Sequence, residues 1–168
     1  KPYIWNYDNT DIVIATNNAE AARVTADGVY APAHIGKFNV KWHGAVGDGT
    51  TDDSAAVLDA MEYARDNRGN MEVPGGRFRL NSAVVLTATG AAKQFGIVGQ
   101  GKGTTEFFVP STNSTGGIHV NVSGTSDFSD QVLMRDFTMT KEGTGGYGIK
   151  MTQGSPGNQH LRNLEMIS

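Results

Sequence analysis

Two parts of the chain repeat each other, and this internal repeat limits the possible folds more than any other feature. Leu133–Met139 aligns with His160–Met166, apolar on apolar and polar on polar, and Gly117–Val120 aligns in the same way with Gly148–Met151. The offset is about 30 residues, which lies within the repeat lengths of solenoid proteins. The repeat predicts coils that each carry two short strands separated by Gly, Ser and Asn turns, with Phe95–Gly101 as a strand of an earlier coil.

The stretch Phe38–Leu80 contains a short strand, a glycine-rich turn, an amphipathic helix, a second strand, a Pro-Gly-Gly turn and a third strand, in that order. The alternation of apolar and polar residues in Phe38–Trp42 predicts a half-buried strand. The glycines of Gly44–Gly49 tolerate positive φ, so the chain is expected to reverse there. Met71–Val73 and Arg77–Leu80 are the predicted strands on either side of the Pro-Gly-Gly turn.

A single amphipathic helix is predicted from Ser54 to about Asn67. Apolar and polar residues recur along it at helical spacing, so that each kind gathers on one face. The apolar stripe consists of Val57, Ala60, Met61 and Ala64, and the polar face of Asp59, Glu62, Arg65 and Asp66. A helix with one apolar face needs a surface to cover.

Both ends of this helix carry recognisable signals. Either Thr51 or Asp52 can cap its start through a side-chain oxygen, and Asp53 adds negative charge at the positive end of the helix dipole. Gly69 is expected to end the helix, because a left-handed residue after the last turn costs glycine little.

The run GAVGDGTTDD, the helix and the run VPGGRFRL resemble the N-terminal segment of the pectate-lyase-like right-handed parallel β-helix proteins, which include phage tailspikes and polysaccharide depolymerases. The resemblance implies an all-β fold, consisting of the first coils of a right-handed parallel β-helix with one N-terminal capping α-helix. The helix would cover the first coil, which otherwise exposes core residues and unpaired backbone groups. Tailspike relatives are trimers, so the resemblance also implies a homotrimer.

The chain is expected to have two parts. Residues 1–36 form an N-terminal extension or neck, and residues 37–168 hold the capping segment and the first coils. The first part is either a simple extension laid on the domain or a segment that joins chains into a trimer and attaches them to a larger particle. The chain stops inside a predicted strand, so it is expected to be truncated at its C-terminus or closed by partner chains.

The N-terminal part has its own pattern. Its aromatic start, with Tyr3, Trp5 and Tyr7, suits an anchor or a local core. Asp11–Thr16 is a predicted strand, and a hairpin is predicted about Asp27-Gly28.

Composition excludes several classes of protein. A chain of 168 residues with 22 glycines, 18% charged residues and no cysteine fits one turn-rich all-β domain without disulfides or thiolate sites. The formal net charge of −3, with no basic run, argues against a nucleic-acid partner. No apolar stretch is long enough to cross a membrane, and the N-terminus lacks the order of a signal peptide.

Cleavage of a polysaccharide generally needs paired carboxylates for hydrolysis, or a base beside a charge-neutralising cation for β-elimination. Turn formation and helix capping account for Asp48, Asp52 and Asp53. Arg135 and Asp136 are consecutive in one strand, so their side chains are expected to point to opposite faces. The catalytic candidates are three acidic residues on predicted coil strands or loops, which would otherwise be solvated surface residues: Asp130, Asp136 and Glu142.

The sequence predicts no metal site and no cofactor. The histidines His34, His43, His119 and His160 lack the spacing of metal ligands. His119 lies in a predicted strand and could face solvent or a sugar. Gly96–Gly101 is not followed by a helix pattern or a suitably placed lysine, so turn glycines explain it better than a nucleotide-binding loop.

Several functions remain open. In the first, the chain belongs to a phage tailspike-type protein that binds and degrades bacterial surface polysaccharide, namely capsule, lipopolysaccharide or exopolysaccharide, and this segment is mainly structural. In the second, it is a non-catalytic receptor-binding or adhesin module. In the third, it belongs to a secreted polysaccharide lyase, hydrolase or uronate epimerase. The first would place the protein on the virion, with a phage tail or baseplate protein as a further partner of the N-terminal segment, and the third outside the cell.

Overall fold

The structure is a computed structural model that describes residues 12–16, 19–25, 28–30, 37–89, 95–123, 132–153 and 159–167. The chain divides into two compact units, Lys1–Ile35 and Gly36–Ser168.

In the first unit, three strands form an antiparallel sheet in the order β1-β2-β3: β1 (Ile12–Thr16), β2 (Ala19–Thr25) and β3 (Gly28–Tyr30). Thr25 pairs with Gly28, so the predicted hairpin is confirmed. The aromatic residues Tyr3, Trp5 and Tyr7 lie outside the described residues.

In its described residues, the second unit contains one α-helix, one 3-10 helix and a series of short strands. In chain order they are β4 (Lys37–Asn39), η1 (Val40–His43), β5 (Asp48–Asp52), α1 (Ser54–Asp66), β6 (Asn70–Glu72), β7 (Gly76–Arg79), β8 (Val84–Thr89), β9 (Phe95–Val98), β10 (Thr105–Val109), β11 (Ile118–Ser123), β12 (Val132–Lys141), β13 (Ile149–Gln153) and β14 (Gln159–Ile167).

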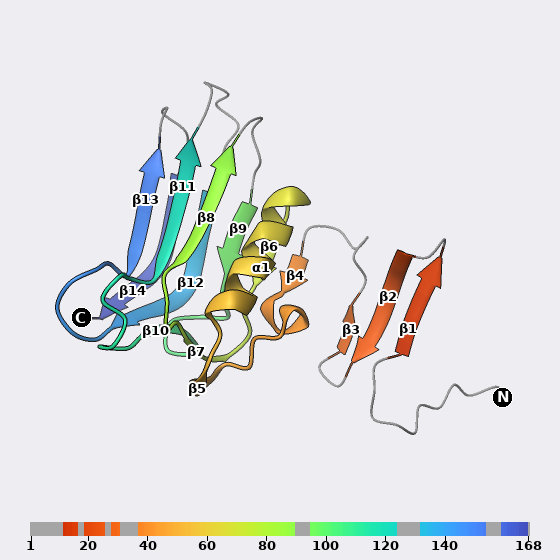
Figure 1. Cartoon of the computed structure of the whole chain (residues 1–168), viewed down its shortest axis with the longest axis horizontal. Coiled ribbons are helices and arrows are strands. Elements are labelled where there is room, and N and C mark those ends of the chain that lie inside the picture. The colour runs from red at the N-terminus through yellow and green to blue at the C-terminus, as the bar shows by residue number, and fades with distance from the viewer. Residues whose placement is uncertain are drawn as a thin grey trace. The chain divides into compact units, whose positions relative to one another are not determined.

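These strands form two parallel sheets (Figure 1). One has the order β4-β6-β9-β12-β10-β7-β5 with β14 also paired to β12, and the other has the order β13-β11-β8. Every strand pair described in residues 37–167 is parallel. The fold is therefore mostly parallel β-sheet with one α-helix.

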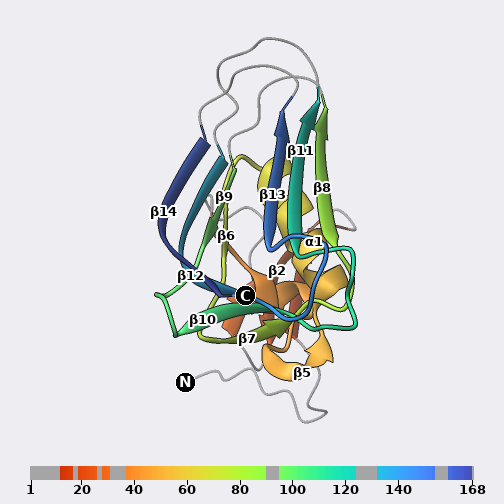
Figure 2. The same ribbon diagram turned by 90° about the vertical axis from the view of Figure 1, so that its left-hand side faces the viewer.

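Strand β12 joins two groups of strands into one curled sheet (Figure 2). Its first half pairs with β9, and its second half, from Thr138, pairs with β10. Earlier in the chain, the same corner lies between two separate strands. Residues 99–104 form it between β9 and β10, and Pro74-Gly75 forms it between β6 and β7. The chain then continues to the second sheet. We call one such passage, for example β9-β10-β11, a coil.

The pairing of strands confirms the repeat predicted from the sequence. Leu133 pairs with His160 and Met139 with Met166, while Ile118 pairs with Ile149 and Val120 with Met151. Both sequence alignments are therefore the register of neighbouring strands. A slip by one residue would move each apolar side chain to the opposite face, so burial fixes this register.

Equivalent apolar side chains of successive coils stack to form the core. Phe107 pairs with Phe78 in the coil before it, and their ring centroids lie 6.0 Å apart. The Phe137 ring contacts the Phe107 ring edge-on at 5.2 Å. All three side chains are fully buried, and burial of each contributes about 1.5–3 kcal/mol relative to leaving it in water.

Helix α1 covers the start of this core. The predicted apolar stripe is confirmed, because Val57, Ala60, Met61 and Ala64 are all 0% exposed. The helix contacts η1, β4, β6, β8 and β9.

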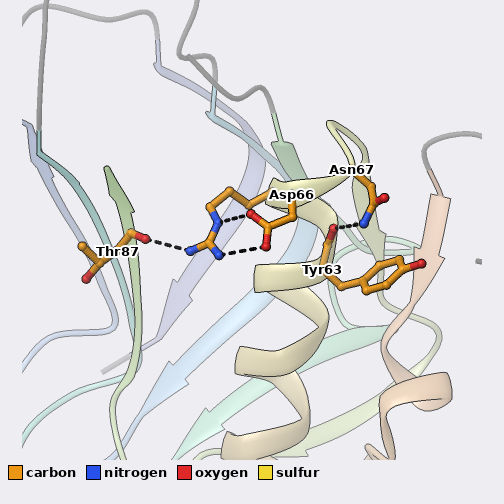
Figure 3. A network of polar contacts seen from close by, with 5 residues as sticks. Tyr63, Asp66, Asn67 and Thr87 are labelled. Carbon is orange, nitrogen blue, oxygen red and sulfur yellow. Dashed lines mark hydrogen bonds and ion pairs between the residues drawn. The ribbon is translucent and has the colours of Figure 1, made fainter. Parts of the chain in front are cut away.

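The Arg65 guanidinium lies near the C-terminal end of α1. It donates to the Thr87 carbonyl of β8 at 2.7 Å and forms an ion pair with Asp66 (Figure 3). Since β8 is an edge strand of its sheet, this contact supplies a donor to an edge carbonyl.

Two predictions about local structure are wrong. The strand predicted over Phe38–Trp42 ends at Asn39, whose side chain accepts a hydrogen bond from the Lys41 N–H at 2.9 Å and caps η1. The left-handed residue after α1 is Arg68, with φ 53, rather than Gly69. The Gly69 N–H reaches back to the Ala64 carbonyl at 2.9 Å, which completes a Schellman motif with arginine in the position that glycine usually takes.

Candidate functional site

The carboxylate of Asp53 holds the glycine turn rather than a ligand. The residue is 1% exposed, and it accepts hydrogen bonds from the Val46 N–H at 2.7 Å and the Gly47 N–H at 3.2 Å. It occupies the N-cap position of α1, so its carboxylate lies at the helix N-terminus as predicted. Its side chain makes no capping bond. The backbone of the turn satisfies Asp53 instead.

Asp52, rather than Thr51, contacts the first residue of the helix. Its Oδ1 accepts bonds from the Ser54 N–H at 3.1 Å, the Ser54 hydroxyl at 2.6 Å and the Asn81 N–H at 3.2 Å. Burial acts to raise the pKa of Asp52, but these bonds and the charge of Arg79 outweigh it, so the pKa lies below its ordinary value. This carboxylate is ionised and ties the helix start to the residues after β7.

Asp48 has a comparable role inside the turn. Its Oδ1 accepts bonds from the Thr51 N–H at 2.7 Å and the Thr50 N–H at 2.8 Å, and its Oδ2 accepts one from the Thr51 hydroxyl. The backbone bond from Thr51, followed by that from Thr50, holds the pKa of Asp48 well below its ordinary value. The structure therefore supports structural roles for all three aspartates of the cluster.

Asp136 forms the corner of strand β12. It has φ 63, in the left-handed region, and its carboxylate contacts the guanidinium of the preceding Arg135. The expectation that these consecutive side chains point to opposite faces is wrong, because the left-handed residue interrupts the alternation of the strand. A Cβ at Gly99 would lie 2.1 Å from the Asp136 carbonyl oxygen, so only glycine fits opposite this corner. A carboxylate paired in this way is a structural element of the corner.

Of the other two acidic candidates, the structure describes only Glu142. Glu142 is exposed and follows β12, where its N–H bonds the Val109 carbonyl at 2.9 Å. Asp130 lies outside the described residues. Of the histidines, His34 and the side chain of His160 also lie outside them, and His43 contacts Asp59 on α1 at 2.6 Å.

His119 lies on the outer face of the sheet formed by β8, β11 and β13. Alternate residues of these strands are buried, and the residues between them face outward. His119 pairs with Val85 on one side and with Lys150 on the other. The remaining outward positions described on these strands are all uncharged: Thr87, Asn121 and Thr152.

Two side chains contact His119 on this face, and Lys150 lies near the first of them. Its ring packs edge-on against the Tyr147 ring at 5.7 Å between centroids, and its Nε2 lies 2.9 Å from the Thr152 hydroxyl. The Lys150 Nζ lies 5.6 Å from the centroid of the Tyr147 ring. We call these four residues the outer-face cluster.

The environment sets the charge of the cluster. Burial, and then the positive charge of Lys150, lower the pKa of the His119 imidazole below its ordinary value of 6.5, so it is neutral at pH 7. Burial raises the pKa of the Tyr147 phenol above its ordinary value, so it keeps its proton. At neutral pH the outer-face cluster therefore offers one cation, two rings and polar groups that can donate or accept hydrogen bonds.

Gly116 positions Tyr147. A Cβ at Gly116, which has φ 133, would lie 2.9 Å from atoms of the Tyr147 ring, so a larger residue would push the ring away. Of the outer-face cluster only His119 is a candidate from the sequence, whereas Tyr147, Lys150 and Thr152 are not. The signal was present, since the aligned segments Gly117–Val120 and Gly148–Met151 place His119 opposite Lys150.

A second group of charged residues, also missed, lies on the curled sheet. Arg77 pairs with Glu106 at 3.2 Å, and its guanidinium covers the Phe108 ring at 3.7 Å. The Thr138 hydroxyl donates to Glu165 at 3.0 Å. These acidic groups are bonded within the protein, so the outer-face cluster remains the better candidate for a binding site.

No known protein family, curated protein or solved structure matches this chain. The resemblance to β-helix proteins therefore stays a prediction. Within the described ranges, no three His, Asp or Glu side chains are arranged to hold a metal ion. No helix in the described part of the chain has the length and apolarity to cross a bilayer.

Proposed function

We propose that the chain is the helix-covered beginning of a right-handed parallel β-helix in a tailspike-type protein that binds and degrades bacterial surface polysaccharide. In this proposal the segment mainly covers the start of the solenoid and takes part in a homotrimer, and it presents one glycan-binding face. Residues 1–36 attach it to a phage tail or baseplate protein, which places it on the virion.

Parallel pairing supports the β-helix part of this proposal. Successive coils return to the same sheets in a fixed register, with α1 at their start. Crossover connections between parallel strands are right-handed in about 98% of cases, which favours a right-handed coil.

The outer-face cluster is the observation that carries the binding function. Aromatic rings with a polar group suit a partner that has both an apolar surface and polar groups, as a sugar ring with its C–H face and hydroxyls has. Tyr147 is held by Gly116 and His119, so little side-chain freedom is lost when a ligand packs on its ring. Lys150 adds an exposed cation on a chain of net charge −3, which favours acidic sugars locally.

Binding to purified polysaccharides tests this proposal. The 168-residue chain is applied to immobilised capsule, lipopolysaccharide and exopolysaccharide from a panel of bacteria. We expect at least one to bind, and Tyr147→Ala to weaken binding about fivefold or more, which corresponds to about 1 kcal/mol. Lys150→Met changes an exposed residue and tests the same face without disturbing the core, while Lys102→Met, at an exposed lysine before β10, serves as the control. Binding that is unchanged in both face variants, or absent with every polysaccharide, contradicts the proposal.

Cleavage is expected to need more than this segment. Hydrolysis requires two carboxyl groups roughly 5–9.5 Å apart across one sugar, and those at the helix start are engaged in turns. We therefore expect no new reducing ends and no unsaturated-uronate absorbance from the 168-residue chain. Turnover that is abolished by Asp136→Asn or Glu142→Gln would place the active site in this segment.

One observation favours a polysaccharide lyase as the second candidate function. A neutral His119 beside the cation Lys150 is the pairing that β-elimination uses, with the histidine as base and the lysine neutralising the uronate carboxylate. In that reaction the base removes the proton next to the carboxylate, and the electron pair forms a C=C bond as the bond to the glycosidic oxygen breaks. The leaving oxygen takes a proton from water, and the protonated histidine returns its proton to water. An unsaturated product that disappears in His119→Gln would favour this candidate.

A further inference from the structure

We propose that the outer-face cluster binds the carboxylate of an acidic glycan together with a proton, so that His119 becomes charged when the ligand binds. This inference rests on the proposed glycan-binding function and adds the ligand's charge and the pH dependence of its binding.

The geometry places two potential cations side by side. His119 and Lys150 are register partners on neighbouring parallel strands, and both face outward. Backbones of neighbouring strands lie about 4.8 Å apart, so one carboxylate can contact both side chains. Thr152 can donate a third bond, since its hydroxyl already lies beside His119 Nε2 at 2.9 Å.

The charges around His119 make the coupling strong. Burial, and then the charge of Lys150, oppose a proton on the imidazole and lower the pKa of His119. No outward position described on β8, β11 or β13 is acidic, and the strand partner on the other side is the apolar Val85. Tyr147 stays neutral, and the guanidinium of Arg65, at the Thr87 carbonyl, is already paired with the Asp66 carboxylate of α1. An incoming carboxylate is thus the counter-charge that His119 and Lys150 lack among the described residues of this face.

The sign of the pH effect follows from linkage. A bound carboxylate attracts the protonated imidazole and so raises the pKa of His119. Because coupling is reciprocal, protonation of His119 strengthens carboxylate binding by the same factor. Affinity should therefore rise as the pH falls from 8 toward 5.5, by at most about tenfold per pH unit for one coupled proton. Above this window His119 is neutral, and only Lys150 attracts the ligand.

The Tyr147 ring distinguishes a sugar from a simple anion. It lies beside both cations, 5.7 Å from the His119 ring and 5.6 Å from Lys150 Nζ. A glycan can place its carboxylate at the cations while its ring packs on the tyrosine. Acetate or inorganic phosphate can make only the first contact and should bind much more weakly.

The experiment uses the 168-residue chain with oligoglucuronate and with its carboxyl-reduced form, which keeps the sugar rings and lacks the charge. Calorimetry at pH 5.5, 6.5, 7.5 and 8, in buffers of different ionisation enthalpy, measures affinity and proton uptake. We expect oligoglucuronate to bind with uptake of up to one proton and the reduced form to bind at least tenfold more weakly at pH 5.5. The NMR titration of His119 should move to higher pH when oligoglucuronate is present.

Three variants separate the roles. His119→Gln should retain binding at pH 8 and lose the pH dependence, and Lys150→Met should weaken binding about tenfold. Lys102→Met removes the same charge from an exposed turn away from this face and should change nothing. Binding that is independent of pH, or a reduced form that binds equally well, overturns this inference and leaves the glycan-binding function intact. Loss of polysaccharide and oligosaccharide binding at every pH rejects both.

Discussion

Replacement of Asp53 by alanine should loosen the attachment of the glycine turn to the start of α1. The substitution removes acceptors from the Val46 N–H at 2.7 Å and the Gly47 N–H at 3.2 Å. It also removes a buried negative charge at the helix N-terminus. The backbone bonds of Asp53, from its N–H to the Arg79 carbonyl and from the Val57 N–H to its carbonyl, remain in place.

The expected loss can be worked from these contacts. A hydrogen bond to a charged group contributes about 1.5–3 kcal/mol, and the longer Gly47 bond should lie at the low end. The charge at the helix terminus adds about 0.3–1 kcal/mol. Water can replace part of the loss, because Val46 is exposed and Gly47 is partly exposed. We expect Asp53→Ala to lower the free energy of unfolding by about 2–3 kcal/mol and the Tm by roughly 4–12 °C.

Urea denaturation followed by circular dichroism measures this change, with an unchanged slope showing that the unfolding transition is the same. Asp53→Asn keeps one acceptor and should lose about half as much. Glu62→Gln, on the exposed face of the same helix, is the matched control and should stay within about 0.5 kcal/mol of the wild type. A loss below about 1 kcal/mol for Asp53→Ala would refute the role assigned to this carboxylate.

Three further changes test the helix and its turn. Arg68→Gly should raise the free energy of unfolding by about 0.5–1 kcal/mol, because the left-handed conformation costs arginine more than glycine, and urea denaturation would reject this if the variant were less stable. The pKa values of Asp48 and Asp52 lie below the ordinary 3.8, so their contribution to stability is complete above about pH 4 and is lost as the pH falls through the lower folded values. Asp48→Asn should therefore make the urea midpoint fall less steeply as the pH is lowered below about 4. An acid dependence equal to that of the wild type would contradict the role of Asp48 in the turn. Met61→Ala should lower the free energy of unfolding by about 2–5 kcal/mol, because Met61 is 0% exposed and the substitution leaves a cavity. Met61→Leu should lower it by less than about 1.5 kcal/mol. Equal losses in the two variants would contradict tight packing under the helix.

Burial made some of the fold predictable from the sequence. The apolar stripe of α1 and the aligned repeats reflect positions where a slip would expose apolar side chains, so local sequence and tertiary packing require the same pattern. Val57 and Met61 are examples on the helix, and the pairing of the buried Ile118 with the partly buried Ile149 is one between coils.

Predictions failed where a side chain overrides the local pattern. Val40 and Trp42 alternate with polar residues as in a strand, yet Asn39 caps a 3-10 turn there. Asp136 interrupts β12 through a left-handed backbone that few residues other than glycine adopt, and no sequence period reveals it.

The outer-face cluster shows a different limit. His119 and Tyr147 lie 28 positions apart in the sequence, and only the register between β11 and β13 brings their rings together. The aligned glycines fix that register: the Gly117 N–H bonds the Tyr147 carbonyl at 2.7 Å, and the Ile118 N–H bonds the Gly148 carbonyl at 2.9 Å. In these parallel sheets, burial requires apolar residues at the inward positions of each strand, while packing makes no such demand on the outward positions. A binding site on an outer face is therefore formed by residues that leave no periodic signal, and it becomes visible only when the register that the inward residues impose is applied to the outward ones.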